Sequence, residues 1–359
     1  MKRIYSIDLF KLLFAYIVAL GHFGVTVAPG TNVTVQMFFI ISGFFLARKF
    51  YAVSAKQGTR EYNQWNYTLD HVKSLYPHYL FSLVIFAISK MVKIALPLLN
   101  NFTWSGIGEL GKLLYALIPE MLLVQNTGFF EGGINYPLWQ VCVLVIGGYF
   151  VYGALCIHEK RSRMIVFPAA ILMIQTLLYS GVGLWETVGF FYVPLLRAIS
   201  PMCIGVLTYY LTTTEYYGKI KSHSLLFNAG AVLSLIAIFV FGGYGNVFLI
   251  TFPIVLLAMY EESSWINCVF NRKLFARFGT FSYAIYLNHA VIIHLMKDMC
   301  FPAAESLLDR DIPSALETVI YLVAVTVYSV VTLCIVNKLM SRRAAKKQAS
   351  MAENKPSEY

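Results

Sequence analysis

The stretch SIDLFKLLFAYIVALGH, residues 6–22, decides the fold class of this chain. It is long and apolar, and its only ionisable side chains besides a tyrosine are Asp8, Lys11 and His22. A helix of about 20 apolar residues crosses about 30 Å of hydrocarbon. The stretch therefore predicts a first membrane span, near residues 7–28. No clear small-residue cleavage site follows it, so we expect the span to be retained instead of removed as a signal peptide.

Similar apolar runs recur along the whole sequence. Of 359 residues, 58% are hydrophobic and 13% are charged, and the mean hydropathy is +0.65. A soluble domain of this length has no interior large enough for that composition. The sequence predicts an all-α, polytopic integral membrane bundle of about ten transmembrane helices. The predicted spans lie near residues 7–28, 33–50, 76–98, 136–157, 164–181, 190–213, 224–242, 245–260, 280–299 and 315–337. A further stretch, 110–124, contains charged residues and a proline, and is predicted to be interfacial or re-entrant.

Positive charges are distributed unequally between the predicted loops. The net charge is +10, and with ten spans 21 of the 28 Lys and Arg residues fall on the side that holds both termini. Cytoplasmic loops of membrane proteins carry this excess, so we expect both termini in the cytoplasm and no nucleic-acid partner. Residues 1–340 form the predicted transmembrane domain. Residues 341–359 are a polar tail, predicted to be disordered and to touch anionic lipid.

The six cysteines are predicted to be small buried apolar residues. They form neither a CxxC pair nor a cluster with metal-ligand spacing, so the sequence predicts no metal site.

Lys11 and His22 are the strongest candidates for catalysis because an ionisable group inside a span is costly unless it has a function or a partner. Eleven residues apart, they lie on one helix face, about 20° apart around the axis and about 16 Å apart along it. Lys11 would bind a phosphorylated cytoplasmic donor, and His22 would remove a proton from an external acceptor. The alternatives are a lysine reaching the inner interface and a histidine that hydrogen-bonds a neighbouring helix.

Three other positions are candidates for substrate binding. In the ninth span Ser282, Tyr286 and His289 share a polar face at i, i+4 and i+7. Ser42 precedes Gly43 in the second span, where a small pair also suits close helix packing. Arg197 lies in the sixth span. It either binds a phosphate or carboxylate group, or it hydrogen-bonds backbone carbonyls that neighbouring prolines leave without an N–H partner.

In this order along the chain, these segments resemble the membrane acyltransferase family 3. The opening SIDLFKLLFAYIVALGH, with Lys11, ten intervening residues and His22, is similar to that family's first-span motif. FFIISGFFL and RFGTFSYAIYLNHAVII are similar to its second-span and late-span motifs, and residues 197–205 to a shorter one.

The resemblance implies O-acylation of a glycan or related acceptor at the membrane. The implied donor is acyl-CoA, with acetyl-CoA the simplest, reached from the cytoplasm. The implied acceptor is an extracytoplasmic or lipid-linked sugar, in the plasma membrane of a bacterium. His22 would be the base, and Lys11 would bind the donor or stabilise charge. In one respect the chain departs from the family: Leu144 stands where many members carry a glutamate, five residues after Trp139.

Two other classes of function fit the same pattern. A transporter or flippase of glycan precursors also has many spans with buried polar groups, but carboxylates within the spans are scarce and no convincing inverted repeat is present. A non-catalytic partner of envelope or exopolysaccharide synthesis proteins would explain the missing glutamate. Activity after replacement of His22 separates these classes from the enzyme.

Overall fold

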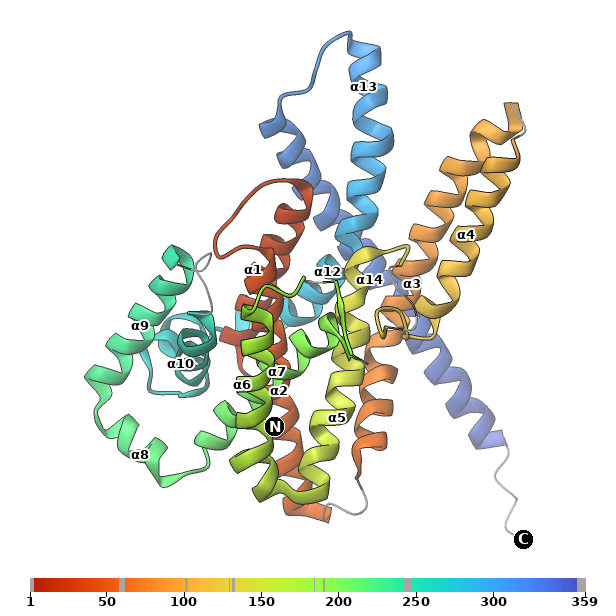
Figure 1. Cartoon of the computed structure of the whole chain (residues 1–359). Helices are drawn as coiled ribbons and strands as arrows, with labels where there is room; N and C mark the ends of the chain where they lie inside the picture. The colour runs from red at the N-terminus through yellow and green to blue at the C-terminus, as the bar shows by residue number, and fades with distance from the viewer. Residues whose placement is uncertain are drawn as a thin grey trace.

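The computed structural model describes residues 3–57, 62–100, 103–128, 130, 133–183, 185–189, 191–241 and 247–353. These residues form a bundle of helices with one two-stranded hairpin, β1 (Thr187–Val188) and β2 (Phe191–Tyr192) (Figure 1). The longer helices are α1 (Tyr5–Phe23), α2 (Thr31–Gln57), α3 (Gln64–Asn100), α4 (Trp104–Met121), α5 (Trp139–Arg161), α6 (Phe167–Tyr179), α7 (Val193–Leu211), α9 (Ser224–Phe241), α10 (Phe248–Tyr260), α12 (Phe278–Leu295) and α14 (Ser314–Glu353). The shorter ones are α8 (Glu215–Ser222), α11 (Trp265–Phe270) and α13 (Phe301–Leu308).

The predicted helical membrane bundle is confirmed. Within the described residues, seven stretches are apolar and long enough to cross a membrane. One of them, Tyr136–Tyr179, contains two predicted spans, which separate at a break in the helix at His158, where φ is −159° and ψ is 87°. The shorter α10 and the more polar α12 account for the remaining two predicted spans. The first described residues of α1 and the last turns of α14 lie toward the same end of the bundle (Figure 1).

Two span boundaries differ from the prediction. The first helix ends at Phe23 instead of near residue 28, because Gly24 adopts a left-handed conformation with φ of 106° and caps the helix. The third helix begins at Gln64, a dozen residues before its predicted start. Its polar first turns had indicated a loop, but they continue the helix beyond the apolar run and so bring His71 into it.

The stretch predicted to be interfacial belongs to α4, which packs antiparallel to the second half of α3 (Figure 1). It is not among the long apolar spans of the described residues. An irregular segment then leads to α5. That segment holds part of the functional site in place.

The tail differs from the prediction in the part that the structure describes. We expected disorder from residue 341, but α14 continues as a helix to Glu353. Its alanines, lysines and arginines have high helix propensity, so an existing helix extends readily through them. Residues 354–359 lie outside the described part.

The close approach predicted at Gly43 is present where α2 crosses α7. A Cβ atom on Gly43 would lie 2.0 Å from the Met202 carbonyl oxygen, and one on Gly205 would lie 2.0 Å from the Ile40 carbonyl oxygen. The two backbones therefore touch at both glycines. Ser42, the neighbour of Gly43, lines the cavity described below.

The first helix lies between α2 and α12 and contacts both. Its Asp8 is held by Arg3 at 2.6 Å and packs against the first turn of α12, where a Cβ on Gly279 would clash with the carboxylate. A carboxylate is favourable at a helix N-terminus because it faces unpaired N–H groups. This contact fixes the register of α1 against α12, which brings Lys11 and His22 opposite the polar face of α12.

Candidate active site

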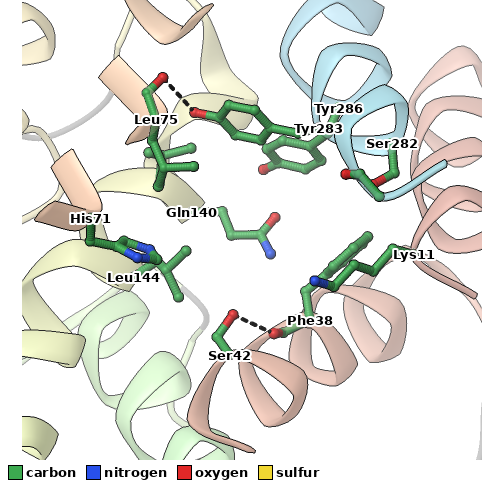
Figure 2. Close-up of a pocket in the computed structure, with 12 residues that line it drawn as sticks. Lys11, Phe38, Ser42, His71, Leu75, Gln140, Leu144, Ser282, Tyr283 and Tyr286 are labelled. Carbon is green, nitrogen blue, oxygen red and sulfur yellow. Dashed lines mark hydrogen bonds between the residues drawn. The ribbon is translucent and has the colours of Figure 1, made fainter. Parts of the chain in front are cut away.

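A cavity of about 210 Å³ lies among α1, α2, α3, α5 and α12. Figure 2 shows Lys11 extending into it from α1, and Ser282 and Tyr286 facing it from α12. Ser42 of α2 lies on the same wall as Phe38, whose carbonyl accepts its hydroxyl at 2.8 Å. The rest of the lining includes His71 and Gln140 together with apolar side chains such as Leu75 and Val141, so the cavity suits a ligand with both polar and apolar parts. We refer to it as the inner cavity.

Two polar groups of the inner cavity are incompletely paired. The Lys11 amine lies 4.9 Å from the centre of the Phe45 ring and forms no ion pair with any residue that the structure describes. The amide of Gln140 points into the cavity, and its Oε1 atom has no hydrogen-bond partner in the described part of the chain. Buried polar groups are normally paired, so both are available for a ligand.

A second hollow of about 360 Å³ shares Lys11, Ser42 and His71 with the inner cavity. It extends toward Lys49 and Asp70, which form an exposed ion pair at 3.2 Å. These residues lie near the end of the bundle where α1 begins, the end that the charge distribution assigns to the cytoplasm. The inner cavity therefore opens toward the end of the bundle at which α1 begins.

His22 lies at the other end of α1 and pairs with His289 of α12. The two rings are nearly parallel, with an interplanar angle of 9° and centroids 5.1 Å apart, and His22 Nδ1 lies 2.8 Å from His289 Nε2. His289 is completely buried, and its Nδ1 atom lies 2.7 Å from the Tyr286 carbonyl oxygen. His22 is only partly buried and packs edge to face with Tyr136, with ring centroids 5.1 Å apart. We refer to His22 and His289 as the histidine pair.

Tyr286 separates the inner cavity from the histidine pair. Its ring lines the cavity, lies 5.7 Å from the His289 ring and 6.4 Å from the Phe38 ring, and its hydroxyl donates to the Pro137 carbonyl. His22 is not among the residues that line the cavity. Tyr286 therefore lies between the inner cavity and the histidine pair.

Glu120 holds the segment that carries Tyr136. It is completely buried at the end of α4, and its Oε1 accepts the Asn135 backbone N–H at 3.1 Å. The Asn135 side chain in turn donates to the Leu287 carbonyl of α12 at 3.3 Å. Burial raises the pKa of the Glu120 carboxyl to about 8, so the group is mostly neutral at pH 7. Tyr136 is thereby placed beside His22.

Arg197 lies near the start of α7 and does not line the inner cavity. It is buried, lies 5.6 Å from the Trp139 ring and donates from Nη2 to Asn32 Oδ1 at 3.4 Å. Asn32 begins α2, next to Thr31, which packs against Gly21 beside His22. Arg197 therefore belongs to the same end of the bundle as the histidine pair.

The structure groups the predicted site residues in three places. Lys11, Ser42, Ser282 and Tyr286 line the inner cavity, His22 and His289 form the histidine pair, and Arg197 lies apart from both. The hydroxyl protons of Ser282 and Tyr286 are engaged by backbone carbonyls, and both ring nitrogens of His289 are occupied. The Tyr286 hydroxyl and His289 thus have protein partners where the sequence had predicted substrate contacts.

Several residues of the site were not predicted. His71 was placed in a loop, and Gln140 was overlooked beside the missing glutamate, although Leu144 one turn later also lines the cavity. Glu120 was noted only as a reason to doubt a membrane span. A glutamate in an otherwise apolar stretch is the signal that could have identified it.

Comparison with known proteins agrees with this arrangement. The acyltransferase family 3 model, described as an acyltransferase domain, matches residues 4–335, nearly the whole chain. A search of the curated proteins gave no match, and neither did a search of the solved structures. The helical membrane fold and this family match define an integral membrane acyltransferase. The chain belongs to acyltransferase family 3.

Proposed function

We propose that the protein transfers an acyl group, acetyl in the simplest case, from cytoplasmic acyl-CoA to a hydroxyl of an extracytoplasmic or lipid-linked glycan. The setting is the plasma membrane of a bacterium, beside the proteins that make an envelope or exported polysaccharide. One observation carries the proposal. A cavity containing Lys11 and a partly exposed His22 lie at opposite ends of one face of α1, with Tyr286 between them.

The donor is assigned to the inner cavity. Lys49 and Lys11 lie along the route from the cytoplasm, and cations there favour the phosphates of coenzyme A. The pantetheine arm carries amides and methylene groups, which match the Gln140 amide and the apolar walls. The thioester at the end of the arm reaches His22 after displacing Tyr286.

The acceptor is assigned to the opposite side. Trp139 and Trp185 pack edge to face at 5.3 Å beside Arg197, and the Trp185 side chain is exposed. Aromatic faces stack on sugars, and a guanidinium binds carboxylate or phosphate. A lipid-linked sugar phosphate or acidic glycan has both features.

His22 supplies the base for direct transfer. Its imidazole takes the proton from the acceptor hydroxyl, whose oxygen then attacks the thioester carbonyl carbon. The tetrahedral intermediate collapses as the carbon–sulfur bond breaks, and the imidazolium returns the proton to the coenzyme A sulfur. Lys11 lies about 16 Å along the helix from His22, so it serves the donor's distal part, not the reacting carbon.

The test is transfer of radiolabel from acetyl-CoA to glycan in sealed inside-out membrane vesicles containing wild-type protein or His22→Ala. We expect labelled glycan with the wild type and a loss of about a hundredfold or more in the variant, since general base catalysis contributes that much. The two proteins are compared at equal expression, and their folding is checked after extraction in detergent. Equal labelling with both proteins would contradict the assignment of His22. Absence of labelling with the wild type, repeated with longer acyl-CoA donors, would contradict the proposed reaction.

A further inference from the structure

The hydrogen bonds of the histidine pair determine where its protons lie. A carbonyl oxygen can only accept, so His289 Nδ1, at 2.7 Å from the Tyr286 carbonyl, must carry a proton. A neutral imidazole has one N–H, which leaves a lone pair on His289 Nε2. That lone pair can accept a hydrogen bond only if His22 Nδ1, at 2.8 Å, carries a proton. Of the two histidines' ring nitrogens, only His22 Nε2 then has a lone pair that no hydrogen bond uses.

Neutrality of His289 follows from its surroundings. Its side chain is completely buried, and no carboxylate contacts either histidine ring in the described part of the chain. The neighbouring rings, Tyr136 and Tyr286, are neutral phenols. A positive charge on this imidazole would be desolvated without an opposite charge to compensate it.

We infer that His289 is a positioning residue that fixes His22 in the tautomer with Nε2 free to act as the base. Nε2 is the ring atom of His22 for which the described residues provide no hydrogen-bond partner, and the His22 ring is only partly buried. A histidine side chain free in water favours the opposite tautomer, with the proton on Nε2. Without His289, His22 would hold its proton on the atom that must accept one.

The inference gives His289 a specific role in the proposed reaction, on which it rests. When Nε2 takes the proton of the acceptor hydroxyl, His22 becomes an imidazolium with both nitrogens protonated. Its Nδ1–H continues to donate to His289 Nε2, so the ring keeps its orientation while the proton passes from Nε2 to the leaving sulfur. His289 itself neither gains nor loses a proton, because its Nδ1–H stays on the Tyr286 carbonyl.

The rival explanation is that the pair only joins α1 to α12, as a hydrogen bond between two membrane helices can. The two explanations predict different results for two substitutions. His289→Leu removes the acceptor, whereas His289→Gln retains an amide oxygen that can accept from His22 Nδ1–H. His294→Leu is the matched control, because His294 is also a buried histidine of α12 but pairs with Asp298 and not with His22.

The kinetic test measures kcat and the KM for acetyl-CoA of the full-length protein in lipid vesicles. We expect His289→Leu to lower kcat by about ten- to a hundredfold, the usual cost of losing a residue that orients a working histidine. The KM should not change, His289→Gln should recover most of the loss, and His294→Leu should keep the wild-type kcat. A folded His289→Leu protein with wild-type kcat, or a Gln variant as inactive as the Leu variant, would overturn the inference.

A spectroscopic test does not depend on activity. Solid-state NMR of ¹⁵N-histidine-labelled wild-type protein in bilayers reports which ring nitrogen of each histidine is protonated, and the His22 signals are those lost in His22→Gln. We expect His22 to be protonated at Nδ1 and unprotonated at Nε2. The reverse assignment would refute the role of His289 even if acyl transfer is confirmed, and the expected one would support it even if the substrates differ from those proposed.

Discussion

The histidine pair and the inner cavity differ in how fully their polar groups are paired. Around the pair, both nitrogens of His289 and Nδ1 of His22 have protein partners. In the cavity, the Lys11 amine lies over the Phe45 ring and forms no ion pair with the described residues, and Gln140 Oε1 has no partner among them. Prearranged hydrogen bonds fix the geometry of reacting atoms, whereas unpaired groups gain partners when a ligand enters. The difference indicates a rigid site for chemistry and an adaptable site for binding.

The largest effect is expected where one change disturbs both regions. α2 contributes Ser42 to the cavity and Asn32 to the Arg197 side, and it is held against α7 at Gly43. Gly43→Ala places a methyl group against a backbone carbonyl, which should destabilise the fold by about 3 kcal/mol. Thermal unfolding in detergent measures this. Gly230→Ala on α9 meets open space and should not destabilise. Equal thermal midpoints for Gly43→Ala and Gly230→Ala would mean that α2 and α7 can move apart at Gly43 without loss of stability.

The second prediction distinguishes binding from chemistry at Lys11. Loss of a charged group that contacts the donor phosphates should raise the KM for acyl-CoA by about tenfold or more, since such a bond contributes about 1.5–3 kcal/mol. Lys11→Ala should therefore change KM far more than kcat, and Lys11→Arg should change it less. Lys112→Ala removes an exposed lysine from α4 and is the control. A large loss of kcat at constant KM would place Lys11 in the chemical step. It would contradict the assignment of binding to the inner cavity and of chemistry to the histidine pair.

A smaller effect is expected at Gln140. Gln140→Leu removes a neutral hydrogen-bonding group from the cavity, so the KM for acyl-CoA should rise about three- to tenfold. The same change removes a buried oxygen that has no partner in the described part of the chain, so the thermal midpoint should stay constant or rise. Kinetics and thermal unfolding on the same preparation check both. A higher midpoint without a change in KM would show that the donor does not touch this amide.

Much of the fold could be predicted from the sequence because lipid imposes a simple rule. Each apolar run of sufficient length forms a helix, and positive charge orients the set. The spacing of Lys11 and His22 also predicted one shared helix face, and in the structure this face lies toward α12. The C-terminal turns of α14 were missed because polar composition alone does not distinguish a tail from a helix that extends past the membrane.

The internal arrangement of the site could not be predicted, since it depends on contacts between distant segments. His22 and His289 are 267 residues apart, and Asn135 and Leu287 are 152 residues apart. Helical spacing places His289 on the face of Ser282 and Tyr286, but it does not reveal whether a face meets substrate or another helix. The packing of α1 against α12 determines that Tyr286 and His289 meet protein groups, and it places His289 against His22.

The smallest predicted effect concerns the support of the histidine pair, where Glu120 holds the segment that carries Tyr136. The pKa of this carboxyl is about 8 in the folded protein and near 4.5 when unfolded. Between these values the unfolded chain releases a proton that the folded protein keeps, so the free energy of unfolding falls as pH rises through this window. Glu120→Gln keeps an oxygen for the Asn135 N–H but does not ionise. Its thermal midpoint should match the wild type near pH 4.5 and exceed it progressively toward pH 8. Glu109→Gln, an exposed change on the same helix, should show no such divergence. If the difference in thermal midpoint between Glu120→Gln and the wild type did not change with pH, Glu120 would be ionised in the folded protein. A neutral Glu120 carboxyl would then not be what holds the segment that carries Tyr136.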